Sequence, residues 1–81
     1  MFLVGDFLKH QILTFLKNKE KQMHNKIKNH INVALMAMLG SQELVSRWWI
    51  SPNKAFDMMT PLEMFDRHAE VVYNYVNTFL S

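Results

Sequence analysis

The spacing of apolar residues predicts helices along the first half of the chain. Over residues 6–39 these residues recur at helical spacing, and neither proline nor glycine interrupts them. They are Leu8, Ile12, Phe15, Leu16, Met23, Ile27, Ile31, Ala34, Leu35 and Met38. The pattern thins between Lys17 and Lys28. The stretch is therefore either one long helix, capped by Asp6, or two helices separated within residues 18–25.

A second helix is expected directly after Gly40, the second of the two glycines in the chain. Gly40 suits the left-handed residue that ends a helix, and Ser41 can cap the next one. This second helix should run to about Trp49, because Val45 and Trp49 form an apolar pair four residues apart.

The middle of the chain contains both prolines and the clearest helix start. Pro52 disfavours helical geometry at the residue before it, so we expect a turn there and a short connector over residues 54–59. Thr60 can cap a helix whose first residue is Pro61. Glu63 follows the cap by three residues, as in a capping box.

A last helix is predicted from Arg67 to Leu80, restarted by Asp66. Its apolar stripe consists of Val72, Val76 and Phe79. No segment alternates with the period of a strand, and no repeat is present. The sequence therefore predicts an all-α fold, a small bundle of four or five helices in one compact domain. We divide it into a basic N-terminal helical segment, residues 1–32, and a helical domain, residues 33–81.

Charge is distributed unevenly between the two halves of the chain. Residues 1–40 carry six lysines and two acidic residues, a net charge of +4. Residues 41–81 carry three basic and five acidic residues, a net charge of −2. The basic half could contact nucleic acid or an acidic partner, or pair with the acidic half of another copy in a homodimer. The lysines concerned are Lys17, Lys19, Lys21, Lys26 and Lys28.

The composition argues against several classes of function. The chain has no cysteine, which excludes disulfides, thiolate metal sites and cysteine nucleophiles. His24 and His30 lie about 240° apart on a helix, so they do not share a face. The two glycines are too few for a phosphate-binding loop. Charged residues interrupt the apolar residues 2–16, so we expect no signal peptide or membrane span. We predict a cytoplasmic, non-enzymatic protein without metal or cofactor.

Several short motifs occur in a distinctive order over residues 33–80. They are Ala34-Leu35, Leu39-Gly40, Arg47-Trp48-Trp49, Ser51-Pro52-Asn53-Lys54-Ala55-Phe56, Thr60-Pro61-Leu62-Glu63 and Val71-Val72. This order resembles the toxin-binding domain of the MbcA/ParS/Xre antitoxins. Asp57 and Met58 stand where that family usually has glycines. Aspartate tolerates a left-handed backbone better than most residues, whereas methionine tolerates it poorly.

The resemblance implies a small helical domain, often dimeric, that binds and blocks a toxin which consumes NAD or transfers ADP-ribose from it. Antitoxins of this family often obstruct the toxin's cleft with their C-terminal part. The expected partner-binding residues are Trp49, Lys54, Phe56, Asp57, Met58, Met59, Asn77, Phe79, Leu80 and Ser81. The expected structural residues of the motif are Trp48, Pro52, Asn53, Thr60, Pro61 and Glu63.

Two other functions remain open on the sequence. The first is an inhibitor encoded by a phage or mobile element, which uses the same fold against a host enzyme or defence complex, as anti-CRISPR proteins do. An adjacent toxin gene would favour the antitoxin, and a phage anti-defence gene cluster would favour the inhibitor. The second is nucleic-acid binding through the lysine-rich helix, which predicts strongly salt-dependent DNA binding.

Overall fold

The computed structural model describes the backbone of residues 4–80 and the side chains from residue 8 to residue 80. The described residues form helix α1 (Val4–Leu39), helix α2 (Gln42–Ile50), the 3-10 turn η1 (Lys54–Phe56) and helix α3 (Pro61–Asn77). The predicted all-α class is confirmed for this part of the chain. The predicted bundle of four or five helices is not confirmed, because the described residues contain three α-helices.

Helix α1 is continuous over its whole length. Of the two alternatives left open by the sequence, the long helix is the one formed, because the polar residues 18–25 remain solvated and contain no helix breaker. Asp6 lies inside this helix, so the prediction that it caps the helix is wrong. Residues 32 and 33 both lie within α1, so the two predicted segments share one helix.

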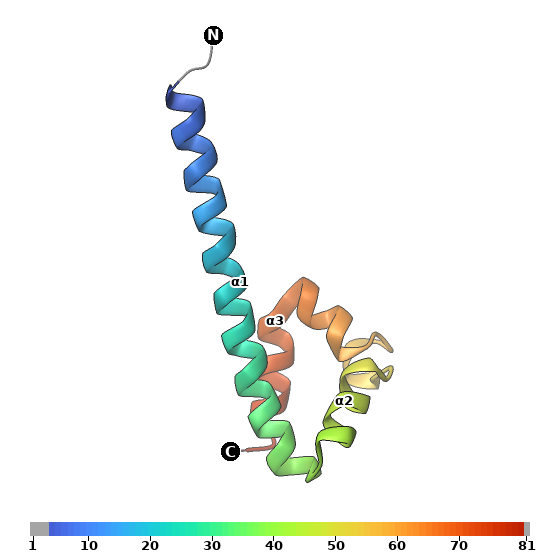
Figure 1. Ribbon diagram of the computed structural model, residues 1–81. Coiled ribbons are helices and arrows are strands. Elements are labelled where there is room, and N and C mark those ends of the chain that lie inside the picture. The colour runs from blue at the N-terminus through green and yellow to red at the C-terminus, as the bar shows by residue number, and fades with distance from the viewer. Residues whose placement is uncertain (1–3, 81) are drawn as a thin grey trace.

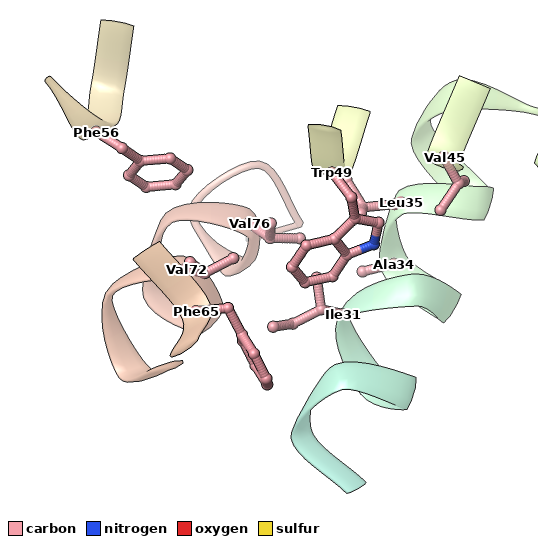
Figure 2. Close-up of a cluster of buried hydrophobic side chains, with 9 residues drawn as sticks. All are labelled: Ile31, Ala34, Leu35, Val45, Trp49, Phe56, Phe65, Val72 and Val76. Atoms are coloured by element: carbon pink, nitrogen blue, oxygen red, sulfur yellow. The ribbon is translucent and has the colours of Figure 1, made fainter. Parts of the chain in front are cut away.

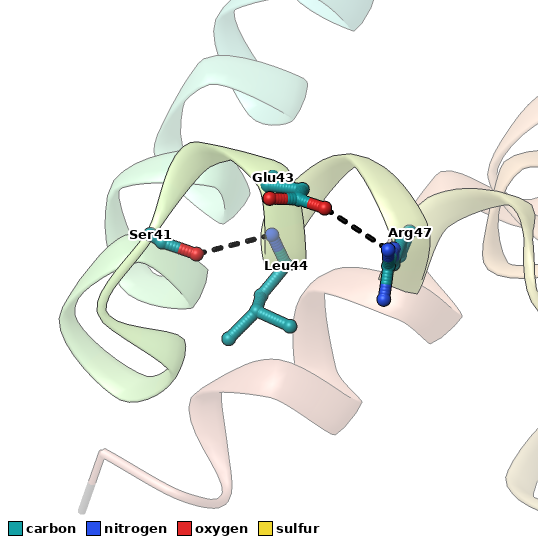
Figure 3. Close-up of polar contacts among 4 residues, drawn as sticks. All are labelled: Ser41, Glu43, Leu44 and Arg47. Carbon is teal, nitrogen blue, oxygen red and sulfur yellow. Dashed lines mark hydrogen bonds and ion pairs between the residues drawn. The ribbon is translucent and has the colours of Figure 1, made fainter.

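The chain turns sharply between α1 and α2. Gly40 has a φ of 84°, the left-handed conformation predicted for a helix end. The Ser41 hydroxyl accepts a hydrogen bond from the backbone N–H of Leu44 at 3.2 Å (Figure 3). Arg47 donates to Glu43 at 3.0 Å across one turn of α2. Both side chains of this ion pair are exposed, so it contributes only about 0.4 kcal/mol to the stability of the helix.

The predicted boundaries around the second turn are also confirmed. The Ser51 hydroxyl donates to the carbonyl of Arg47 at 2.6 Å, where α2 ends. The Thr60 hydroxyl accepts from the backbone N–H of Glu63 at 3.1 Å, and Pro61 is the first residue of α3. These caps satisfy backbone groups that the helix ends would otherwise leave without partners.

Helix α3 consists of two segments joined by a kink. His68 has a φ of −146° and a ψ of 77°, which are not helical values. The restart predicted at Asp66 therefore occurs two residues later. In Figure 1 the first segment leads from the side of α2 towards α1, and the second segment runs along α1.

The core lies between the second half of α1, helix α2 and helix α3 (Figure 2). It consists of Ile31, Ala34, Leu35, Val45, Trp49, Phe56, Phe65, Val72 and Val76. All nine residues follow residue 30, so the first half of α1 contributes nothing to this core. Figure 1 shows that half projecting beyond the other helices. We call residues 8–23 the arm and residues 24–80 the body.

Candidate functional site

The two tryptophans of α2 belong to the fold. The Trp49 side chain is 6% exposed and lies in the core beside Ile31 and Val76 (Figure 2). Its indole Nε1 donates to the side-chain Oδ1 of Asn32 at 2.6 Å, so its polar atom is also satisfied. Trp48 is half-buried and meets the edge of the Trp49 ring at a centroid distance of 5.3 Å. The prediction that Trp49 contacts a partner is corrected, because its side chain packs inside the body.

Phe56 is likewise a core residue rather than a contact residue. Its side chain is 2% exposed, and it ends the 3-10 turn η1. The ring meets Trp48 on one side, at 6.4 Å between centroids, and Tyr75 on the other, at 5.1 Å. Edge-to-face packing of this kind stabilises a core beyond the area that it buries. We therefore assign Phe56 to the fold and remove it from the predicted contact residues.

The connector between α2 and α3 is organised by Asn53. Its backbone N–H donates to the carbonyl of Met59 at 3.1 Å, and its own carbonyl accepts from the N–H groups of Phe56 and Met58 at 3.0 Å. Its side-chain Oδ1 accepts from the N–H of Ala55 at 2.9 Å. Four hydrogen bonds from one residue close the connector into a compact loop. The structural role predicted for Asn53 thus has a specific geometric basis.

Two consecutive residues of the connector have a left-handed backbone. Asp57 has a φ of 55° and Met58 a φ of 69°. This conformation costs an L-residue about 1 kcal/mol or more unless it is glycine, asparagine or aspartate. Asp57 is therefore tolerated, whereas Met58 is strained. The connector therefore follows a glycine-like backbone path at these two positions, although neither residue is glycine.

The strained part of the connector is also its exposed part. The Met58 side chain is 58% exposed, and its neighbours Lys54 and Asp57 are exposed as well. Met59 is half-buried and packs against the core. Three of the predicted contact residues, Lys54, Asp57 and Met58, are thus accessible here. Met59, the other one, packs between them and the core.

Tyr75 of α3 contacts a buried ring of the connector on one side and a C-terminal ring on the other. The ring of Tyr75 is 5.1 Å from Phe56 and 5.2 Å from Phe79, measured between centroids. Phe79 is 58% exposed and Leu80 is also exposed, whereas Asn77 is half-buried. The predicted contact residue Ser81 lies outside the described residues. The structure therefore joins connector and C-terminus through Tyr75, which the sequence analysis did not single out.

We call this region the connector–tail surface. It consists of Lys54, Asp57, Met58, Tyr75, Phe79 and Leu80. Tyr75 is half-buried between the two parts, and the others are exposed. Exposed apolar side chains with charged neighbours are typical of protein-binding surfaces. Tyr75 was missed because only the fold brings its ring between Phe56 and Phe79.

The predicted basic surface is dispersed. Lys17, Lys19, Lys21 and Lys26 are exposed along α1. They point around the helix rather than along one face, as their sequence spacing requires. Lys28 is half-buried, and its Nζ lies 5.3 Å from the centre of the Trp49 ring, so it covers the core.

The described residues offer few groups for other chemistry. No three histidine, aspartate or glutamate side chains among them are placed to share a metal ion. Every side chain classed as buried in that range is apolar. None of the helices in the described part of the chain combines the length and apolar character needed to cross a membrane.

Comparison with protein-family models, curated proteins and solved structures gives no match to this chain. The assignment of function therefore depends on the geometry of the chain itself.

Proposed function

We propose that this chain is a non-enzymatic module that binds a partner protein through the connector–tail surface and blocks it. The observation that carries the proposal is Met58, whose backbone is strained and whose apolar side chain is 58% exposed. A strained residue persists only when the surrounding structure enforces it, and such residues concentrate at functional sites. The four hydrogen bonds of Asn53 hold the connector in this conformation.

The C-terminal residues extend the same surface. Phe79 and Leu80 add two exposed apolar side chains, and Tyr75 links them to the connector. Aromatic side chains flanked by polar groups are common anchors of protein interfaces. Lys54 and Asp57 supply opposite charges at the rim, which would select the orientation of the partner.

The class of partner follows from the antitoxin-like motif order of residues 33–80. By that resemblance the partner is a toxin that consumes NAD or transfers ADP-ribose from it, and the module acts by covering the toxin. A toxin encoded beside this chain is the first partner to test. Its NAD consumption should fall to zero as this chain is added, with an end point at a fixed molar ratio.

The matched variants are Met58→Glu and Phe79→Glu, with Val33→Glu as the control. All three place a carboxylate on an exposed apolar position, and Val33 lies on α1, 72% exposed. We expect the first two to weaken inhibition about tenfold or more, and the control to leave it unchanged. A complex that forms equally well with all three would contradict the assignment of this surface.

Nucleic-acid binding is a second candidate because α1 carries four exposed lysines, at positions 17, 19, 21 and 26. Binding of this kind depends steeply on salt, because each phosphate contact releases counterions. A fluorescence anisotropy titration with duplex DNA at low ionic strength tests it. Absence of binding under that condition removes this candidate and leaves the protein-binding proposal in place.

A further inference from the structure

The arm has an apolar face that no described part of the chain covers. Its six side chains are between 49% and 59% exposed, and they are Leu8, Ile12, Leu13, Phe15, Leu16 and Met23. At 100° per residue, they fall within about 160° of the helix circumference. The opposite side of the arm carries exposed polar residues, namely His10, Gln11, Thr14 and Asn18. The arm is thus amphipathic, and an open apolar face of this extent marks an interaction site.

Basic side chains follow the apolar ones along the arm. Five of the six apolar side chains lie within residues 8–16, and lysines come next, at positions 17, 19 and 21. With Lys9, the arm carries four lysines and one glutamate, a net charge of +3. The two ion pairs of the described residues lie in α2 and α3 and involve none of these lysines. Their charge is therefore available to an anionic surface.

The lysine nearest the middle of the apolar face extends along that face. Its ammonium nitrogen, Lys19 Nζ, lies 5.3 Å from the centre of the Phe15 ring, one turn earlier in the helix. A lysine in this position buries its aliphatic stem against apolar surface and keeps its ammonium in a polar layer. The only carboxylate of the arm, Glu20, lines a hollow of mixed charge between α1 and α3. It therefore lies at the edge of the apolar face that is nearest the body.

We propose that the arm binds the surface of an anionic lipid membrane, with its apolar face against the acyl chains and its lysines among the headgroups. Burial of the apolar side chains and attraction of the lysines to anionic lipids act together in such a helix. Lysines 17, 19 and 21 point around the arm rather than along one face. A rigid partner meets one side of a helix, whereas fluid headgroups reach an interfacial helix from several sides. The dispersed lysines therefore suit a membrane surface.

The order of residues along α1 also suits a membrane. The lysines at 17, 19 and 21 lie between the apolar residues 8–16 and the body, so the body stays in water when the apolar residues enter the bilayer. Figure 1 shows the arm projecting beyond the other helices, which leaves it accessible to a flat surface. Other occupants use only part of this pattern. A nucleic acid leaves the apolar face without a favourable contact, and a second arm brings a like charge of +3.

Cosedimentation of the full chain with lipid vesicles tests the proposal. One set of vesicles contains phosphatidylcholine alone, and the other contains about one third of anionic phosphatidylserine. At low ionic strength we expect binding to the anionic vesicles that is at least about tenfold tighter than to the neutral ones and that weakens as salt is added. A chain that does not bind the anionic vesicles, or that binds both kinds equally, overturns the proposal.

Substitutions in the arm separate the apolar contribution from the charge. Leu16→Gln keeps the net charge and should weaken binding to the anionic vesicles by about tenfold. Thr14→Gln, about 160° around the helix from Leu16, is the control and should change binding by less than about twofold. Lys17→Gln combined with Lys19→Gln should weaken binding by about tenfold or more, and only to the anionic vesicles. Binding that Leu16→Gln leaves unchanged contradicts the proposal.

The absence of cysteine allows a single fluorescent label to report which side of the chain meets the lipid. With a polarity-sensitive label on Leu16→Cys, Thr14→Cys or Ser46→Cys, we expect the largest blue shift on vesicle binding at position 16. Ser46 is exposed on α2 of the body, so its label should remain in water. A shift at position 46 as large as that at 16 would mean that the body is the contact. A chain that binds no vesicles but dimerises through Leu16 would equally overturn the proposal. None of these outcomes bears on protein binding by the connector–tail surface, which lies on the body.

Discussion

At the scale of single residues, Met58 is where backbone strain and exposure coincide. Met58→Gly should increase the free energy of unfolding by about 1 kcal/mol, because glycine adopts a φ of 69° without the steric cost of a Cβ atom. Urea denaturation followed by circular dichroism measures this change. If the side chain is the anchor that we propose, the same variant binds the partner more weakly although it is more stable.

Met58→Ala is the control for this prediction. Alanine keeps the Cβ atom and therefore the strain, so we expect no gain in stability from it. A Met58→Gly chain that is no more stable than the Met58→Ala chain would show that the connector stores no strain at this position.

Trp49 and Asn32 form the second feature to test at this scale. Trp49→Phe removes the indole N–H that donates to Asn32 at 2.6 Å and reduces the volume of a buried ring, so it should destabilise the body by about 2 kcal/mol. A double-mutant cycle with Asn32→Ala, followed by urea denaturation, separates the two effects. We expect a coupling energy of about 1 kcal/mol. Additive losses would mean that this hydrogen bond contributes nothing to stability.

At the scale of helices, the start of α3 depends on Thr60. Thr60→Ala should lower the free energy of unfolding by about 1 kcal/mol, because the N–H of Glu63 loses its acceptor. Thr60→Ser keeps the hydroxyl and should retain most of the stability. Thermal unfolding of both variants gives the comparison. Equal losses in the two would point to the threonine methyl group rather than to the cap.

Sequence reasoning succeeded where helix ends depend on local chemistry. The left-handed Gly40 and the caps at Ser41 and Thr60 involve residues at most three positions apart, so residue types determine them. It failed where the structure depends on packing between segments that are distant in the sequence. Nothing near Trp49 indicates that its indole meets an amide oxygen 17 residues earlier. The non-helical backbone of His68 has no signal of its own in the sequence either.

The candidate site shows the same division. Lys54, Asp57 and Met58 were expected at the site from the family resemblance, and all three side chains are exposed in the structure. Phe56 was misassigned, since a ring in a short connector turns inward only when Tyr75 provides a surface for it. The uncovered arm could not be predicted either, because an apolar stripe at helical spacing is ordinarily covered by the rest of its own domain.

At the scale of the whole molecule, the fold separates two surfaces. The connector–tail surface belongs to the body, whereas the exposed apolar side chains of residues 8–23 belong to the arm, and the chain extends over 57 Å in its longest dimension. All nine core residues lie at position 31 or later, and the partly buried hydrophobic residues that pack against them begin at Ile27. The arm is therefore not needed to complete the core.

Removal of residues 1–20 tests this separation. The remaining 61 residues should unfold cooperatively, because they keep the whole core, although a domain of about this size buries only about 60% of its surface and is marginally stable. We expect the two chains to differ in stability by at most about 1 kcal/mol, measured by urea denaturation. A shortened chain that fails to fold would show that the arm supports its own body.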